Sequence, residues 1–360
     1  MSTPGPAADL AVELVSTPSV SGEEETVARR LETWARQSGV HATRDETGVR
    51  LEVAGGLPGP TLLLASHLDT VPAGEGWTID PFAGLVEGGV LRGRGAVDAK
   101  ASVAAMAAAA AEWTRRGGPA RGRLVVLATF GEETRHTSMP RALERLGAPV
   151  DAALIGEPTG LEPCVAQRGL LVLTLRWRGA QVHAGWAADL DTAPDNAILV
   201  AADQLARLEG FAMPRVHPRL GRVAFTPTRI EAGIARNVTP PVCEALLDVR
   251  TTPAHSHGEI VAALRAALPR TEVEVVSDRL RPVETPDGSR LLEAIRRVRP
   301  GCRPFASPTS SDWVFLADVD GVKLGPGDSR LSHTPDEAIA LDEIDEAARL
   351  YAAIAGEYLS

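Results

Sequence analysis

Three short apolar runs, each followed within a few residues by histidine or acidic residues, constrain this chain more than any other feature of its sequence. They occupy residues 61–65, 124–128 and 152–155. Continuous apolar runs of this length are typical of strands that are buried on both faces of a sheet. Between the first two runs, residues 99–115 form a segment with strong helix propensity. Buried strands that alternate with helices predict an α/β layer with helices on both sides of the sheet.

The pattern changes near Gly169. From Leu171 to Trp177 apolar and polar residues alternate, which predicts a strand with one exposed face. Further helices and strands are predicted downstream, with helices at about 195–208 and 257–268 and strands at 222–231, 242–250 and 272–276. The resulting order, β-α-β-β-α-β, is that of a ferredoxin-like unit.

The length of the chain also favours two domains, because 360 residues exceed the size at which a single core stops growing. We predict a discontinuous catalytic domain, residues 1–168 and 279–360, built on a mixed α/β sheet. The ferredoxin-like α+β domain, residues 169–278, is predicted to be inserted in it. The catalytic domain is expected to end in a helix at residues 341–358.

The overall charge excludes several classes of partner. The formal net charge is −10, and no run of lysine and arginine forms a basic patch, so neither nucleic acid nor an anionic membrane is an expected partner. The three cysteines are too widely separated for a disulfide framework or a cysteine zinc site. The first residues lack the pattern of a secretory signal, and the longest apolar run is too short to span a bilayer. We therefore expect a cytoplasmic protein.

Polar residues gather directly after the buried runs. His67 and Asp69 follow the first, Glu132 and Glu133 the second, and Glu157 the third. Each of them alone has an ordinary interpretation as a hydrogen-bonded histidine or a solvated loop. In open α/β sheets, however, sites form where strands end, so their common placement predicts a site.

Two further residues complete a candidate metal site. Asp98 follows a Gly93-Arg94-Gly95 turn, and His333 lies near the C-terminus. Together with the strand-end residues they supply the two histidines and three carboxylates that two divalent metals sharing one carboxylate need. Imidazole and carboxylate ligands suit zinc, with cobalt or manganese as alternatives. The glycine turn lacks the rest of a dinucleotide fingerprint, and there is no P-loop, which argues against a nucleotide-dependent enzyme.

The ordered series of motifs resembles the M20 family of metallopeptidases and deacylases over nearly the whole chain. The family's His-x-Asp motif is matched by His67 and Asp69, and its Gly-Arg-Gly-x-x-Asp-x-Lys motif by residues 93–100. Its Glu-Glu pair, its Gly-Glu-Pro motif and its C-terminal metal histidine are matched by residues 132–133, residues 156–158 and His333.

The resemblance implies a role for each ligand. Asp98 would bridge two metal ions. His67 and Glu157 would complete one site, and Glu133 and His333 the other. A cis peptide bond is implied directly after the bridging carboxylate, between residues 98 and 99.

Two acidic residues would act beside the metals. The resemblance implies that Asp69 accepts a hydrogen bond from His67 and so fixes its tautomer. Glu132 would take a proton from the attacking water and then deliver it to the leaving amine.

Three residues of the inserted domain would contact the substrate. In the resembling family, positions matched by Asn237 and Arg250 bind the α-carboxylate of the substrate, a task that suits the planar fork of arginine. The position of His183 reaches the active site of a partner subunit and donates to the oxyanion. The resemblance therefore implies a homodimer built through the inserted domain, which also acts as a lid.

The C-terminal motifs at residues 307–312 and 323–337 look most like those of acetylornithine and acetylcitrulline deacetylases. The favoured reaction is therefore removal of an acetyl group from N-acetylornithine or N-acetylcitrulline, in arginine biosynthesis. The alternatives within the family are a hydrolase that frees lysine or ornithine from a carrier protein, a dipeptidase and a succinyl-diaminopimelate desuccinylase. An alternative of another class is a catalytically inactive metal-binding homologue.

Overall fold

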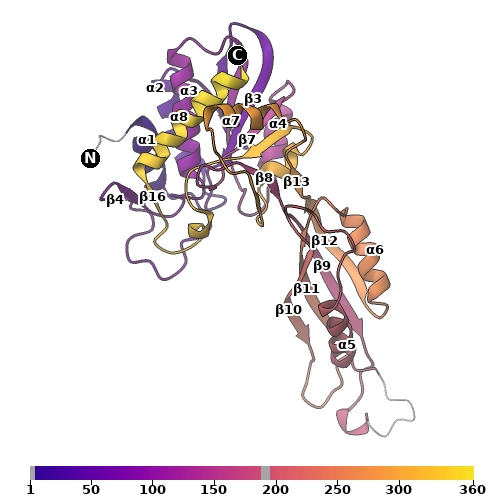
Figure 1. The fold of residues 1–360 in the computed structure, drawn as a ribbon. Coiled ribbons are helices and arrows are strands. Elements are labelled where there is room, and N and C mark those ends of the chain that lie inside the picture. Colours follow the sequence, from indigo (N-terminus) through magenta and orange to yellow (C-terminus); the bar gives the residue numbers. More distant parts are fainter. Residues whose placement is uncertain (1–4, 188–194) are drawn as a thin grey trace. The chain divides into compact units, whose positions relative to one another are not determined.

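The computed structural model describes residues 5–187 and 195–360 (Figure 1). The chain divides into two compact units. The first comprises Met1–Val165, Glu284–Phe305 and Ser311–Ser360, and the second Ala166–Val283 and Ala306–Ser310. The segment predicted as the inserted domain, residues 169–278, lies within the second unit. Among the described residues no helix is long and apolar enough to cross a membrane.

The first unit is built on a mixed sheet, as predicted. Its strand order is β1-β2-β6-β3-β7-β15-β8-β13, with β14 paired to β8. The bounds of these strands are β1 (His41–Asp45), β2 (Gly48–Ala54), β3 (Leu57–His67), β6 (Arg121–Thr129), β7 (Ala152–Ile155), β8 (Cys164–Gln167), β13 (Val283–Glu284), β14 (Phe305–Ser307) and β15 (Asp320–Lys323). Strands β6, β3, β7 and β15 run parallel, so their carboxyl ends lie at the same edge of the sheet.

Helices cover this sheet. The α-helices of the first unit are α1 (Pro6–Val15), α2 (Glu25–Gln37), α3 (Lys100–Arg115), α4 (Ser138–Arg145), α7 (Arg290–Val298) and α8 (Leu341–Tyr358). Two 3₁₀ helices, η2 (Asp312–Leu316) and η3 (Ser329–Leu331), join them. The alanine-rich α3 packs against β2, β3 and β6, and both α1 and α8 pack against α3. Small side chains allow this close approach, and every residue of α3 from Lys100 to Ala111 is buried.

Strand β3 shows why a continuous apolar run predicts a strand covered on both sides. Leu62 and Leu64 belong to the core formed with α1, α3 and α8. Leu63 and Ala65 point to the opposite face, because successive side chains alternate along a strand, and they are equally buried. The helical spacing of Val27 and Leu31 likewise identifies α2, where both are buried.

Helix α1 and a small three-stranded sheet were not anticipated from the sequence. The small sheet consists of β4 (Leu85–Glu87), β5 (Val90–Arg92) and β16 (Ala338–Ala340). The ammonium group of Lys100 donates to the carbonyl oxygens of Leu14 and Thr17, at 3.0 and 2.8 Å, and so fixes the end of α1. Burial lowers the pKa of Lys100 to about 7. The lysine of the second motif therefore anchors the start of α3 rather than facing the site.

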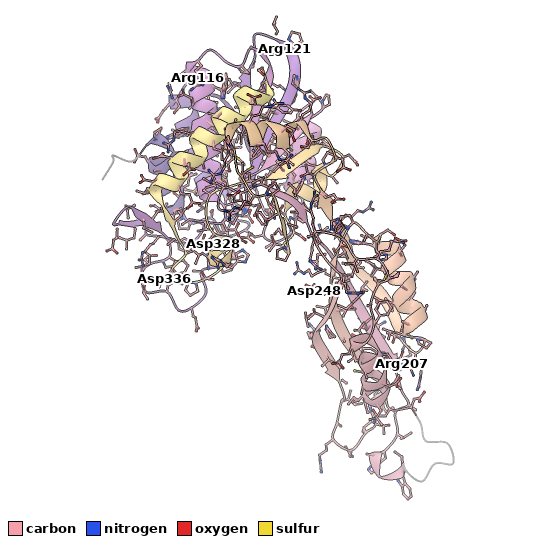
Figure 2. The ribbon with its side chains drawn as sticks, in the orientation of Figure 1. Arg116, Arg121, Arg207, Asp248, Asp328 and Asp336 are labelled. Atoms are coloured by element: carbon pink, nitrogen blue, oxygen red, sulfur yellow. The ribbon has the colours of Figure 1, made fainter. Side chains whose placement is uncertain are left out.

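The second unit has the predicted ferredoxin-like order. Its elements are β9 (Gly169–Arg178), η1 (Ala184–Trp186), α5 (Ala197–Glu209), β10 (Ala224–Ala232), β11 (Val242–Thr251), α6 (His257–Ala267) and β12 (Glu272–Leu280). The strands form an antiparallel sheet in the order β10-β11-β9-β12. Leu173 and Trp177 of β9 are buried in a core shared with α5 and α6, whereas Arg176 points outward and pairs with Glu244. The alternation in β9 therefore marks a strand with one covered face. On the outer surface of α5, Arg207 pairs with Asp203 (Figure 2).

Candidate active site

The ends of parallel strands bring the predicted site residues together. His67 is the last residue of β3, Glu133 lies in the turn after β6, and Glu157 follows β7. Gly156, between β7 and Glu157, cannot be replaced without displacement, because a Cβ there would lie 2.5 Å from the side chain of Met106. The missing side chain lets the end of β7 lie directly against α3.

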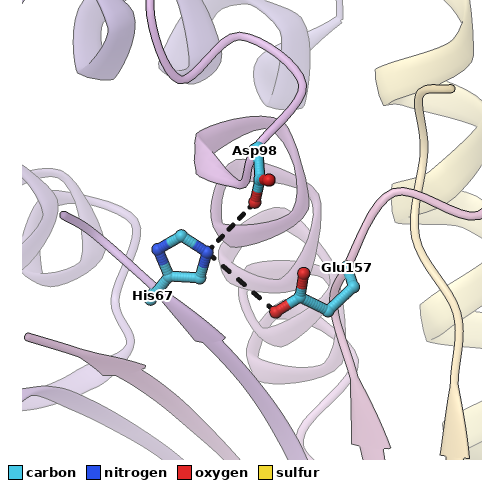
Figure 3. Close-up of side chains that lie close together, drawn as sticks. All are labelled: His67, Asp98 and Glu157. Atoms are coloured by element: carbon cyan, nitrogen blue, oxygen red, sulfur yellow. Dashed lines mark hydrogen bonds and ion pairs between the residues drawn. The ribbon is translucent and has the colours of Figure 1, made fainter. Parts of the chain in front are cut away.

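His67, Asp98 and Glu157 form the first group of candidate ligands (Figure 3). The Nε2 atom of His67 lies 3.2 Å from Oδ1 of Asp98 and 4.0 Å from Oε1 of Glu157. His67 is almost completely buried, and the two carboxylates are only slightly exposed. The three side chains converge from the end of β3, from the second residue before α3, and from the loop after β7.

Asp98, Glu133 and His333 form the second group. The Nε2 atom of His333 lies 2.9 Å from Oε1 of Glu133 and 3.5 Å from Oδ2 of Asp98. Asp98 therefore offers one oxygen to each group, which is the arrangement that a bridging carboxylate requires. The peptide bond between Asp98 and Ala99 is cis, as predicted.

The two groups fit divalent metal ions. Within each, the ligand atoms all lie within 4.8 Å of one another. Ligands about 2.0–2.2 Å from a tetrahedral zinc ion lie about 3.4 Å apart, and the distances given above bracket that value. The histidine and carboxylate donors are those that zinc prefers.

The charges of these side chains also fit cations. Burial, reinforced by the charge of Asp98, raises the pKa of Glu157 to about 8. Burial opposes the charged form of His67, yet hydrogen bonds to Asp69 and Asp98 raise the pKa of this histidine well above its usual value. Carboxylates crowded in a low-dielectric site repel one another unless positive charge is close by, and two metal ions would supply it.

The atom of Asp69 nearest to His67 is its main-chain oxygen, whereas the expected partner was its carboxylate. The Nδ1 atom of His67 lies 3.0 Å from the main-chain oxygen of Asp69 and 3.5 Å from its carboxylate. That carboxylate instead accepts hydrogen bonds from the hydroxyl of Ser21 and from the main-chain N–H groups of Glu132 and Glu133. Asp69 therefore ties the end of β3 to the Glu132–Glu133 turn, in addition to facing His67.

Glu132 stands outside both groups of ligands. Its side chain is almost buried, and burial raises its pKa well above the usual value. The negative charges of Glu157, Asp312 and Glu133 act in the same direction, whereas the charge of His67 opposes them. A carboxylate whose affinity for a proton is raised in this way suits a group that accepts and then returns a proton.

Glu337 lies at the end of the C-terminal motif, and the sequence pattern assigns it no role. Its buried carboxylate accepts hydrogen bonds from the main-chain N–H groups of Gly95, Val97 and Asp98, at 2.7–3.1 Å. It also forms a 2.7 Å ion pair with the buried side chain of Arg94. Glu337 therefore holds the loop that carries the shared carboxylate, although its own carboxylate belongs to neither group of ligands.

This arrangement predicts that Glu337→Gln weakens metal binding about 10–100-fold, the usual effect of losing a partner that orients a ligand. The amide NH₂ of glutamine would face main-chain donors, and Arg94 would lose its buried counter-charge. Competition with a chromophoric chelator measures the affinity. Asp336→Asn serves as the control, because Asp336 is only partly buried and its carboxylate accepts hydrogen bonds from the N–H and hydroxyl groups of Thr78 rather than from the loop that carries Asp98 (Figure 2). Equal metal affinity in the two variants would contradict the role of Glu337.

The three predicted residues of the inserted domain lie within the second unit. His183 and Asn237 come from adjacent segments, since His183 forms a β-bridge with Val238 and the N–H of Ala184 donates to the carbonyl oxygen of Asn237. Arg250 lies near the opposite end of β11, where it pairs with Leu170 and donates to the carboxylate of Asp248. A ten-residue strand spans about 30 Å, so one chain does not bring Asn237 and Arg250 together.

Comparison with known proteins identifies the family. Residues 63–357 match the family model for peptidase family M20/M25/M40, and the chain belongs to this family of metal-dependent hydrolases. The chain is 31% identical to a succinyl-diaminopimelate desuccinylase of Methylobacterium sp. strain 4-46, over 99% of this chain and 96% of the relative. It is 30% identical to a [LysW]-lysine/[LysW]-ornithine hydrolase of Sulfurisphaera tokodaii, over 95% of this chain and 93% of the relative.

A solved structure supports the fold. The YXEP protein of Bacillus subtilis, described as a dinuclear metal-binding peptidase of the M20 family, has a TM-score of 0.76 at 18% identity. The match covers 97% of this chain and 96% of that one. Both units of the present chain therefore belong to the shared fold.

Proposed function

We propose that this protein is a dinuclear metal amidohydrolase that releases a free amino acid from an N-acyl derivative. The observation that carries the proposal is the pair of ligand groups that share Asp98, with Glu132 beside them and outside both. The family supports a hydrolase with two metal ions, and the donor set supports zinc. His67 and Glu157 would hold one ion and Glu133 and His333 the other.

The bound ions would lower the pKa of water and polarise the acyl carbonyl group, which is the chemistry that such a centre supplies. The chain's own contribution is the placement and transfer of protons. Glu132 accepts the proton of the attacking water and then donates it to the nitrogen of the scissile amide, since an amine leaves only when it is protonated. Asp69 keeps Glu132 in place through the main-chain N–H group of that residue.

The substrate proposed here has an amine part that is a diamino acid. Diaminopimelate, lysine and ornithine appear in the names of the two relatives, and each carries a second amino group. The acetylornithine reaction favoured from the motifs shares this property. The relatives nevertheless favour the alternatives, a succinyl group or a carrier-protein acyl group, over acetyl. They also favour lysine synthesis over arginine synthesis.

The second unit is proposed to act as the lid and the dimer interface. His183 would donate to the oxyanion across a homodimer, and Asn237 and Arg250 would bind the substrate carboxylate. Because one chain separates Asn237 from Arg250 by the length of β11, their joint use of one carboxylate requires two copies of the chain.

One panel of substrates tests the proposal. We expect the enzyme loaded with zinc or cobalt to hydrolyse N-succinyl-diaminopimelate faster than N-acetylornithine, and N-acetylcitrulline most slowly. Release of the free amine is followed for each, alongside a dipeptide and a lysine amide of a glutamyl peptide. Faster hydrolysis of N-acetylcitrulline than of every diamino acid derivative would contradict the substrate class. No hydrolysis by a protein with two bound metal ions would favour the inactive homologue.

A further inference from the structure

A third group of side chains lies directly beside Glu132. The Nδ1 atom of His136 is 2.9 Å from Oδ1 of Asp312 and 3.7 Å from Oε1 of Glu132. The side chains of His136, Glu132 and Asp312 are 13%, 9% and 5% exposed. Neither His136 nor Asp312 lies in a sequence pattern that assigns it a role.

Asp312 is held in place by its own contacts. It is the first residue of η2, whose N-cap is the buried Ser311. Its second carboxylate oxygen, Oδ2, receives a hydrogen bond from the hydroxyl of Thr129, the last residue of β6, at 3.4 Å. One oxygen of Asp312 thus faces the sheet and the other faces His136. Because Asp312 is fixed in this way, it also fixes the plane of the imidazole ring.

His136 occupies a backbone position that suits glycine. Its φ angle is +51°, in the left-handed region that non-glycine residues adopt uncommonly, although Asn, Asp and His do so more often than other residues. The main-chain N–H groups of Arg135 and His136 both donate to the carbonyl oxygen of Gly131, which closes the tight turn that carries Glu132 and Glu133. A turn of this kind does not itself require histidine, so the imidazole needs another explanation.

We propose that His136, held by Asp312, is a positioning residue that orients the carboxylate of Glu132 for proton transfer. The Nδ1–H group of His136 donates to Asp312. The same nitrogen also lies near Oε1 of Glu132, and a slight movement would let the two carboxylates share this hydrogen bond. The inference rests on the proposed function, because it acts through Glu132. His136 would hold the carboxylate of Glu132 in the orientation that proton transfer requires. Orientation matters because misplacing a reacting group by about 1 Å costs up to about 100-fold in rate.

The test replaces the ring without disturbing the turn. Glycine accepts φ of +51° readily, so His136→Gly keeps the backbone while removing the imidazole. We expect kcat to fall about 10–100-fold, with KM unchanged and two metal ions retained per subunit. Added imidazole should restore part of the lost kcat in this variant and none in the wild type. His136→Asn, which also tolerates this backbone and keeps a side-chain donor, should lose less than His136→Gly.

A double variant links the effect to Glu132. In a Glu132→Gln background His136→Gly should cause no further loss of kcat, because a residue that acts only through Glu132 has nothing left to position. An additional loss as large as in the wild-type background would overturn the proposal.

The remaining outcomes separate this inference from the proposed function. If the wild-type enzyme hydrolyses no substrate of the panel, the proposed function and this inference fail together. If the wild type is active and His136→Gly keeps the wild-type kcat, only the positioning role fails. Loss of metal from His136→Gly would show a structural role instead. A third equivalent of zinc that binds the wild type but not His136→Gly would show a metal site, and would likewise overturn the proposal.

Discussion

A Glu132→Gln variant is expected to fold and to bind two metal ions per subunit as the wild type does, yet to lose about 10²–10⁴ in kcat, the usual contribution of general acid–base catalysis. The amide has nearly the shape of the carboxylate but cannot accept the proton of the attacking water. The main-chain N–H group of residue 132 still donates to the carboxylate of Asp69 in this variant, so the turn should keep its conformation. Steady-state kinetics on the best substrate of the panel and metal analysis of the same sample check both halves of this expectation.

The neighbouring residue provides a matched control. Glu133→Gln removes the same charge one position along the chain, but its carboxylate lies 2.9 Å from Nε2 of His333 and belongs to a ligand group. This variant should lose one metal ion per subunit, whereas Glu132→Gln should lose none. The reverse result would mean that the roles of the two glutamates are exchanged.

The second large effect is expected from His183→Ala, which should lower kcat about 10²–10³-fold, as the removal of one oxyanion donor typically does. His183 is exposed in the second unit, where it is the N-cap residue of η1, and it is a member of neither ligand group. Both metal ions and the proposed homodimer should therefore be retained. Metal analysis and sedimentation of the purified variant check these two points.

Mixed dimers decide whether His183 acts across a subunit interface. One subunit carries His183→Ala and the other Glu132→Gln, with different affinity tags so that only the mixed dimer is purified. If His183 works in trans, one site receives an intact Glu132 from its own chain and an intact His183 from the partner. About half of the wild-type activity should then return. Activity no higher than that of the two parent variants would show that His183 does not act in trans.

Much of the fold follows from local sequence patterns. The apolar run at residues 61–65 identifies β3 because each of its residues is covered by protein, whichever face it points to. The alternation in β9 and the helical pattern that ends the chain are equally local signals. The predicted metal ligands could be found for a related reason, since His67, Glu133 and Glu157 lie at or shortly after the ends of strands whose carboxyl ends meet.

The residues that were missed depend on contacts between distant parts of the chain. His136 and Asp312 are separated by 176 residues, and neither position carries a local pattern that indicates the other. Glu337 lies 239 residues from Asp98, and its four partners are mainly backbone groups, which leave no trace in the residue types. The carbonyl oxygen of Asp69 was overlooked as the nearer partner of His67 for a different reason: it lies only two residues away, but it is a backbone group that the residue type does not reveal.

The large sequence separation between Glu337 and its partners affects the order in which parts of the protein can fold during synthesis. Chains grow on the ribosome from the N-terminus, so the loop of Gly95, Val97 and Asp98 emerges long before the carboxylate that receives its N–H groups. Until then Arg94 has no counter-charge from Glu337, and His333 has yet to join Glu133. A nascent chain can form the early strands of the first unit first, but it can complete the metal centre only after residues 333–337 have been synthesised.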